Sequence, residues 1–165
     1  MANTYTLISS NTVGSGGSTL VTFSSIPSTY TDLMLRHSAR TDTTDARIKI
    51  GLNANINFSW TSLYNFDGSV ISQIGNYGYG GVASTSDFTA STFGNTDIYI
   101  PNYGATVAHS FSVDSVNETN STSIDQIFLA GLRNNTDPIT TIDVFPFTGN
   151  FVQYSTFYLY GIKNS

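Results

Sequence analysis

Arg47-Ile48-Lys49-Ile50-Gly51-Leu52 alternates polar and apolar residues more cleanly than any other stretch of the chain. Because successive side chains of a β-strand point to opposite faces of a sheet, the pattern predicts a strand that buries its three aliphatic side chains and leaves Arg47 and Lys49 in water. One buried and one wetter face is typical of antiparallel sheets. The stretch therefore favours an all-β fold.

The same two-residue period recurs on both sides of this strand. Short alternating runs are bounded by Gly, Asn, Asp, Ser or Pro, the residues that favour turns. In Asp32–Ala39 the period places Leu33, Leu35 and His37 on one face. The other predicted strands are Thr4–Ser9, Thr19–Ser24, Asp97–Ile100, Thr106–Val116, Ser123–Leu132, Ile139–Phe145 and Phe151–Ile162.

The middle of the chain carries a hairpin signal followed by a change in composition. Asp67-Gly68 lies between the apolar runs Leu63–Phe66 and Val70–Ile74, and a two-residue type I′ turn favours such a pair because both residues need positive φ. Phe58–Phe66 also has a spacing that could hold a turn or two of helix. From Gly75 to Ser91 the chain is rich in Gly, Ser and Tyr without a sustained period, which predicts a long exposed loop.

Around ten short strands with no alternating helices predict a two-sheet antiparallel β-sandwich or barrel, and we favour a jelly-roll-like sandwich. No segment has helical spacing over ten or more residues, and no period of 20 to 50 residues indicates a propeller or solenoid. The 165 residues fit a single domain, 1–165, which can bury enough surface to fold without disulfides or metals.

The composition favours binding over catalysis. Only 10% of the residues are charged, whereas Ser, Thr and Asn supply 60 of 165, and the chain has no Cys, one Glu and two His. A formal net charge of −5 leaves no excess of Lys and Arg for phosphates, which argues against nucleic acid as a partner. No apolar run is long enough to span a bilayer, and Met1–Tyr5 lacks the features of a secretion signal, so we expect neither membrane insertion nor a cleaved signal.

The few candidate catalytic and metal-binding residues are dispersed. His37 and His109 have no second ligand at zinc-binding spacing, and we interpret both as hydrogen-bonded core histidines. Asp42 and Asp45 could offer oxygens to Ca²⁺, but their loop lacks the register of a calcium-binding hand, and Asx-turns explain them more simply. We predict no catalytic residue, no metal site and no cofactor.

The arginines do not suggest a catalytic site either. No Gly-x-Ser-x-Gly elbow accompanies the serines, so a small hydrolase on a jelly-roll fold is a third, disfavoured interpretation. Arg36, Arg40 and Arg133 are expected to make rim contacts or exposed ion pairs.

Two regions resemble a known module. Near the start stands Ala2-Asn3-Thr4-Tyr5-Thr6-Leu7-Ile8, followed by Val21-Thr22-Phe23-Ser24-Ser25-Ile26-Pro27. The distal region contains Ile98-Tyr99-Ile100-Pro101-Asn102-Tyr103 and the run Ser155-Thr156-Phe157-Tyr158-Leu159-Tyr160-Gly161-Ile162. These segments resemble the β-sandwich module of tailed-phage virion proteins, notably those of cyanophages. The resemblance spans almost the whole chain and is weakest from Thr41 to Ser91.

The resemblance implies a role on a virion without choosing its position. Similar modules serve as capsid decoration, or cement, proteins on the outer head surface and as parts of tail fibres. We favour decoration because one sandwich accounts for the whole chain, with no heptads or shaft repeats. The expected partner is then the major capsid protein, and the expected assembly is a homotrimer. The alternative is a tail module, among tail proteins, that recognises host-surface carbohydrate.

Aromatic residues are the candidate contact residues in both interpretations. Tyr158 and Tyr160 alternate with apolar residues in the last strand, so they either meet a neighbouring subunit or lie half-exposed with their hydroxyls in water. Tyr77 and Tyr79 of the Tyr/Gly segment could grip a virion protein, stack on a sugar with Trp60, or belong to an ordinary mobile loop. Tyr103, in the distal motif, completes the set.

Overall fold

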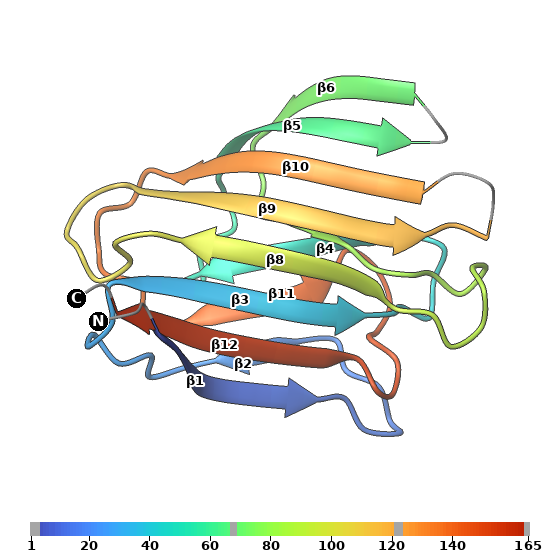
Figure 1. Ribbon diagram of the computed structural model, residues 1–165, viewed down its shortest axis with the longest axis horizontal. Coiled ribbons are helices and arrows are strands. Elements are labelled where there is room, and N and C mark those ends of the chain that lie inside the picture. Colours follow the sequence, from blue (N-terminus) through green and yellow to red (C-terminus); the bar gives the residue numbers. More distant parts are fainter. Residues whose placement is uncertain (1–3, 67–68, 121–123, 164–165) are drawn as a thin grey trace.

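A computed structural model describes residues 4–66, 69–120 and 124–163. In this part of the chain the regular structure consists of strands in two antiparallel sheets, with no helix (Figure 1). The strands are β1 (Thr4–Thr12), β2 (Val21–Phe23), β3 (Asp32–Ala39), β4 (Arg47–Leu52), β5 (Ser59–Phe66), β6 (Ser69–Gly75), β7 (Tyr79–Val82), β8 (Gly94–Ile100), β9 (His109–Glu118), β10 (Ile124–Arg133), β11 (Ile142–Pro146) and β12 (Thr156–Lys163).

The two sheets form a sandwich of unequal layers. The larger has the order β1-β12-β3-β8-β9-β10-β5-β6, and the smaller, β2-β11-β4-β7, lies behind its middle in Figure 1. Their facing sides enclose the hydrophobic core, in which Ile48 and Leu35 are fully buried. The predicted all-β class and β-sandwich are confirmed.

The strands with the clearest alternation are predicted to the residue. β4 spans Arg47–Leu52 and buries Ile48, Ile50 and Leu52, as expected. β3 spans Asp32–Ala39, and its predicted inner face is completely buried. Both strands are internal, because β4 pairs with β11 and β7 while β3 pairs with β12 and β8.

The ends of the described chain lie side by side in the larger sheet. β1 pairs antiparallel with β12, and Thr4 stands opposite Lys163. The register shifts between Leu7 and Ser9, which marks a bulge in the edge strand β1. This strand runs to Thr12, three residues beyond its predicted end at Ser9.

The possible helical turn at Phe58–Phe66 is wrong. This segment forms β5, which pairs with β10 on one side and β6 on the other in an unbroken register. The predicted hairpin is confirmed in its strands, since Phe66 stands opposite Ser69. The predicted turn, Asp67-Gly68, lies outside the described residues.

The long exposed loop predicted for Gly75–Ser91 is also wrong in its first half. Tyr79–Val82 forms the buried strand β7, and the burial continues to Thr85. Glycines are needed here because the backbones approach closely: a Cβ on Gly80 would lie 3.2 Å from Cβ of Ile50, and Gly81 has a φ of +101°. Glycine has no side chain to show the alternation, so the strand leaves no periodic trace in the sequence.

The remaining differences are shifts of strand ends. β2 is shorter than Thr19–Ser24, whereas β8 begins three residues before its predicted start at Asp97. β12 begins at Thr156, although Phe151 makes isolated bridges to Ser18 and Thr41. No helix in the described residues is long and apolar enough to cross a membrane.

Candidate functional site

The larger sheet turns one face toward the core and the other, its outer face, away from the smaller sheet. On the outer face, register partners line up in two rows that cross all eight strands from β1 to β6. The charged row is Ser10, Tyr158, Arg36, Asp97, Asp114, Phe128, Leu63 and Ser72. The neutral row is Leu7, Tyr160, Met34, Tyr99, Ser112, Ala130, Thr61 and Ile74. Every member of both rows is exposed or half-buried.

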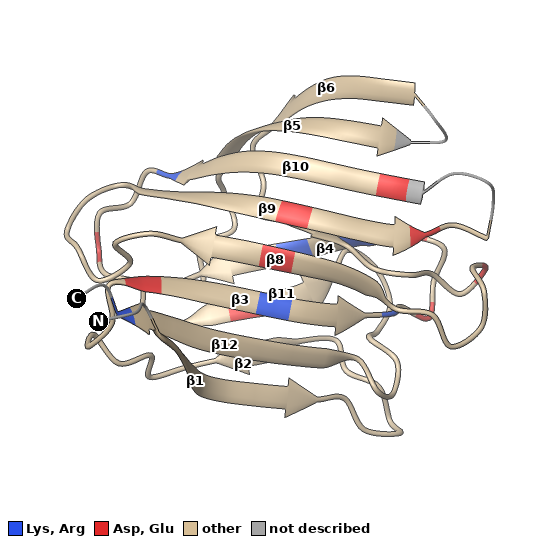
Figure 2. Ribbon diagram, viewed as in Figure 1, with Lys and Arg blue, Asp and Glu red and all other residues tan. Residues whose placement is uncertain are grey.

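Three charged side chains, Arg36, Asp97 and Asp114, lie together at the centre of this face. Figure 2 shows coloured segments in the middle of β3, β8 and β9, whereas β1, β5 and β6 carry none. Arg36 donates two hydrogen bonds of 2.6 Å to the Asp97 carboxylate, and these bonds raise the pKa of the guanidinium. Both side chains remain more than a third exposed, so we expect the pair to contribute less than about 1 kcal/mol to folding. This exposed ion pair was predicted for Arg36.

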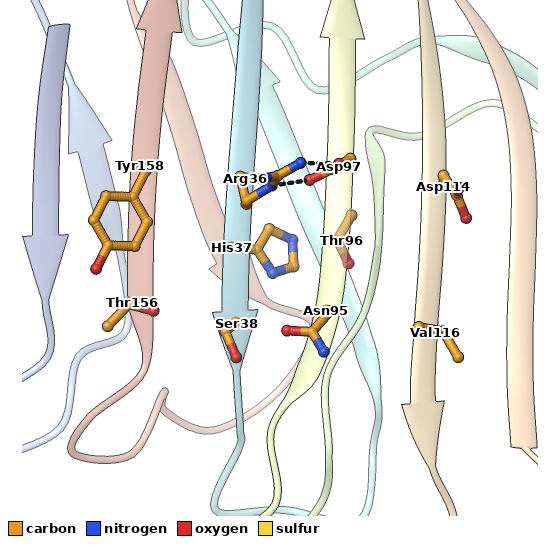
Figure 3. A pocket seen from close by; sticks show the side chains of 10 residues that line it. All are labelled: Arg36, His37, Ser38, Asn95, Thr96, Asp97, Asp114, Val116, Thr156 and Tyr158. Carbon is orange, nitrogen blue, oxygen red and sulfur yellow. Dashed lines mark hydrogen bonds and ion pairs between the residues drawn. The ribbon is translucent and has the colours of Figure 1, made fainter. Parts of the chain in front are cut away.

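A shallow hollow of 370 Å³ lies beside this ion pair (Figure 3). Figure 3 shows Arg36 and Asp97 joined across two strands, with Tyr158 on one side and Asp114 on the other. Asp114 is the register partner of Asp97, so two carboxylates stand on adjacent strands next to one guanidinium. The hollow therefore offers hydrogen-bond acceptors at the centre of an otherwise neutral surface.

Aromatic side chains gather on the outer face near β1. The rings of Tyr158 and Tyr160 are stacked, with centroids 6.3 Å apart and planes 24° apart. Tyr5 meets Tyr160 edge-on at 6.2 Å, and it is 56% exposed. The predicted contact residues Tyr158 and Tyr160 are therefore half-buried on an uncovered sheet face, a position that fits both interpretations of the sequence.

Aliphatic and aromatic side chains gather at the opposite end, over β10, β5 and β6. Phe128 is 48% exposed and stands opposite Leu63, which is 57% exposed. On β6, Val70 and Ile74 point to the same face and are 72% and 82% exposed. This end of the larger sheet extends beyond the smaller sheet in Figure 1. The sequence analysis did not single out these residues, although alternation in Ser123–Leu132 could have identified Phe128.

Three of the predicted contact residues lie inside the protein. Trp60, Tyr79 and Tyr103 are 6%, 8% and 1% exposed. The Tyr79 ring packs against Trp60 with centroids 5.4 Å apart, and the Tyr103 hydroxyl donates to the carbonyl oxygen of Pro27. Direct stacking of a sugar on Trp60 and Tyr79, as an exposed loop would allow, is therefore wrong for this conformation.

Tyr77 links that buried cluster to a cleft at the open end of the sandwich. Its ring is edge-on to Trp60, Tyr79 and Phe147, at centroid distances of 5.5, 5.8 and 6.2 Å. The cleft has a volume of 640 Å³ and lies between the inner face of β5, β6 and β10 and the segments around residues 44–47 and 87–88. Its lining includes Tyr64, Tyr77, Gln73, Asp45, Arg47 and Asp87.

Charge and burial give the cleft a defined polarity. Arg47 donates to both oxygens of Asp45, at 2.9 and 2.7 Å, and this pairing lowers the pKa of the Asp45 carboxyl. Burial, with the nearby Asp125 carboxylate, raises the pKa of Tyr64 to about 12, so its hydroxyl keeps its proton at neutral pH. Carboxylates, an amide and phenol hydroxyls beside aromatic rings can hydrogen-bond and stack a small polar ligand.

Both histidines are buried and bonded to backbone carbonyls, as predicted. Nε2 of His37 donates to the Gly80 oxygen at 3.2 Å, and Nε2 of His109 to the Asp137 oxygen at 3.1 Å. Burial lowers the pKa of His37 to about 4. Neither imidazole has a nucleophile or a carboxylate as its hydrogen-bond partner.

The predicted acidic loop is occupied by hydrogen bonds within the chain. The Asp45 carboxylate accepts a hydrogen bond from the backbone N–H of Arg47 in an Asx-turn, as expected. The Asp42 carboxylate instead accepts hydrogen bonds from the backbone N–H and the side-chain amide of Asn150. These bonds lower the pKa of Asp42. In the described ranges no three His, Asp or Glu side chains are grouped in a way that could hold a metal ion.

Two arginines differ from expectation in what they bind. Arg133 is 1% exposed, not at the surface, and donates to both oxygens of Asp137 at 2.8 and 2.9 Å. Arg40 donates to the carbonyl oxygens of Thr89, Phe88 and Thr92, so it fastens the segment that precedes β8. Both act on the backbone of a neighbouring loop, a role for which the sequence carries no local signal.

No known family model matches the chain, and no curated protein matches it with significance.

Proposed function

We propose that the protein is a non-enzymatic structural protein of a tailed-phage virion, and that it decorates the outer surface of the head. The outer face of the larger sheet carries this proposal. It is broad, open, nearly neutral and bordered by exposed aromatic and aliphatic side chains. Surfaces that bind other proteins are enriched in aromatic residues, and large exposed apolar side chains mark interaction sites. Such side chains lie at both borders of this face, whereas Arg36, Asp97 and Asp114 place charge at its centre, where protein interfaces usually carry little.

The proposed partner is the major capsid protein. Tyr158 and Tyr160 at one end of the face and Phe128 and Leu63 at the other would bury apolar area against two neighbouring capsid subunits. The hydroxyls and the exposed Arg36–Asp97 pair between them would supply directional hydrogen bonds. Contacts that span a subunit junction would cement the shell, since separating the subunits would expose them. By the resemblance to decoration proteins, the assembly is a homotrimer.

The experiment that tests the proposal is to locate the protein on intact particles by cryo-electron microscopy or with a specific antibody. Regular density over the head supports decoration, whereas signal confined to the tail supports the alternative. Absence from every particle refutes a virion role.

A double variant then tests whether the protein binds the particle through its outer face. Tyr158→Ala combined with Tyr160→Ala is expected to reduce occupancy at least about tenfold, because tyrosines are enriched among the few interface residues whose truncation costs about 2 kcal/mol or more. Tyr154→Ala, which removes a 67% exposed tyrosine outside the two rows, is the matched control. Unchanged occupancy in the double variant would exclude this end of the face as the contact.

The cleft supports a second candidate, a tail module that recognises host-surface carbohydrate. Tyr64 and Tyr77 offer rings, and Gln73 and Asp87 offer acceptors, within a volume suited to a small ligand. A glycan array probed with the wild type and with Gln73→Ala tests it, because Gln73 is exposed and its loss should spare the fold. Glycan binding that the variant loses would favour this candidate, and an array without binding would remove it.

A further inference from the structure

In the described residues the two sheets have four edge strands: β1 and β6 in the larger sheet, and β2 and β7 in the smaller. Three of these edges are protected against pairing with another chain. β1 contains a bulge, which disrupts the regular ladder that an added strand needs. β2 has only three residues. β7 is buried and its register against β4 is shifted. The N–H of Val82 in this strand donates to the Ser115 hydroxyl at 2.9 Å.

β6 has none of these protections. Its register with β5 is unbroken over all seven residues, and every residue from Ser69 to Ile74 is exposed. The strand contains no charged residue and no proline, the residues with which edge strands usually block pairing. Alternate residues of β6 direct their N–H and C=O groups away from β5, and among the described residues no strand pairs with this edge.

The side chains of β6 are complementary to a second copy of themselves. In an antiparallel pair centred on Ser72, Val70 of each copy stands opposite Ile74 of the other, and Ser72 stands opposite Ser72. Both aliphatic side chains lie on the outer face, 72% and 82% exposed, and would cover each other across the joint. Because the strand is neutral, its two copies meet without like-charge repulsion.

We propose that two copies of the protein pair through β6, about a two-fold axis at Ser72, to form one continuous sheet. Such an axis stands perpendicular to the sheet, so both outer faces point to the same side and the two charged rows join end to end at Ser72. The second copy is favoured over β1 of another copy, because the bulge in β1 interrupts the ladder.

This inference does not rest on the proposed function. A three-fold contact, as decoration would require, must then use another part of the surface, and the two contacts can coexist. In either case a variant that breaks the β6 joint should halve the molar mass of the assembly.

The first test is molar mass by light scattering after size exclusion, for the wild type, Ser72→Lys and Ser10→Lys. Ser10 is the matched control, because it is an exposed serine at the β1 end of the same charged row. We expect Ser72→Lys to halve the mass and Ser10→Lys to leave it unchanged. A wild-type monomer, or a wild-type trimer that Ser72→Lys leaves intact, would overturn the β6 joint, and the trimer would leave the decoration proposal standing.

The second test does not depend on weakening the joint. The chain has no cysteine, so Ser72→Cys introduces a single thiol at the proposed axis. Opposed residues of an antiparallel pair have Cα atoms about 4.5 to 5.5 Å apart, a separation that a disulfide accepts. Under mild oxidation we expect a covalent dimer from Ser72→Cys at a dilution where Ser10→Cys remains uncrosslinked. Equal crosslinking of the two variants would refute the specific pairing, as would its absence from both.

Discussion

Gly78, which directly precedes β7, lies so close to β4 that no space is left for a side chain. Its N–H donates to the Ile56 oxygen at 2.5 Å, its oxygen accepts from the N–H of Ile50 at 3.0 Å, and an added Cβ would fall on the carbonyl oxygen of Ile50. A backbone atom cannot turn aside as a side chain can. We therefore expect Gly78→Ala to lower the free energy of unfolding by about 3 kcal/mol, measured by urea denaturation.

Gly104 provides the control for this prediction. A Cβ there would meet no atom within 4 Å, so Gly104→Ala should change the free energy of unfolding by less than about 0.5 kcal/mol. Equal effects of the two substitutions would contradict the argument from close approach.

His37 should make stability depend on pH. Burial lowers its pKa in the folded protein to about 4, whereas the unfolded chain binds the proton near pH 6.5. The unfolded state therefore gains protons first as the pH falls from 6.5 to 4, and the folded state loses stability over that window. Linkage gives a loss of about 2 kcal/mol between pH 7 and pH 5.

The measurement compares urea unfolding at those two pH values in the wild type and in His37→Gln. Hydrogen bonds also lower the pKa values of Asp42, Asp45 and Asp137, and the protein loses their contribution to stability in acid as well. Both proteins keep these carboxyls, so the difference between them isolates the histidine. A His37→Gln protein that shows the same loss as the wild type would contradict this assignment.

Individual residues also show how much of the structure could be predicted from the sequence. The faces of His37 and His109 follow from alternation, and so do the half-exposed tyrosines of the last strand. Tyr79 could not be placed because the glycines on both sides of it hide the period, and Trp60 could not because the aromatic spacing of Phe58–Phe66 suits either a short helix or a strand. The burial of Arg133 depends on Asp137, four residues on and in the loop after its strand, and nothing in the local pattern predicts that ion pair.

Among the elements, β6 should be the least protected strand of the larger sheet. It is an edge strand exposed on both faces, whereas β3 is internal and covered by the smaller sheet. In Ser72→Lys, where the proposed joint is broken, we expect β6 amides to exchange with deuterium before those of β3 and β8. Hydrogen exchange with mass spectrometry measures this order. If the amides of β6 exchanged as slowly as those of β3, a contact outside the described fold would have to protect β6.

The contrast between β4 and β7 explains which elements could be predicted. β4 alternates aliphatic with charged residues, so its ends and its inner face follow from the sequence. β7 reads Tyr-Gly-Gly-Val and is buried throughout, and its glycines, which allow a close approach to β4, leave no alternation in the sequence. The segment at Phe58–Phe66 was ambiguous because its aromatic spacing suits either a short helix or a strand, and pairing with β10 decides it.

At the scale of the whole molecule, the core should melt in one transition. The first and last strands pair with each other, and the same core cluster includes residues of both sheets. Urea unfolding followed by the fluorescence of Trp60, the single tryptophan, should therefore coincide with unfolding followed by far-ultraviolet circular dichroism. Separate midpoints would instead show that the β5 end unfolds independently of the rest and would contradict the single-domain prediction.

Because Thr4 pairs with Lys163, the order of the strands along the chain could be changed without changing how they pack. A short flexible linker could join the existing ends, and new ends could be opened in the exposed segment between β8 and β9, at Val107. The resulting circular permutant would keep every strand neighbour, and its termini would lie at the same edge of the sandwich, beside β8 and β9 instead of β1 and β12 (Figure 1). A domain fused to the original chain would therefore leave this edge beside β1 and β12, and one fused to the permutant would leave it beside β8 and β9.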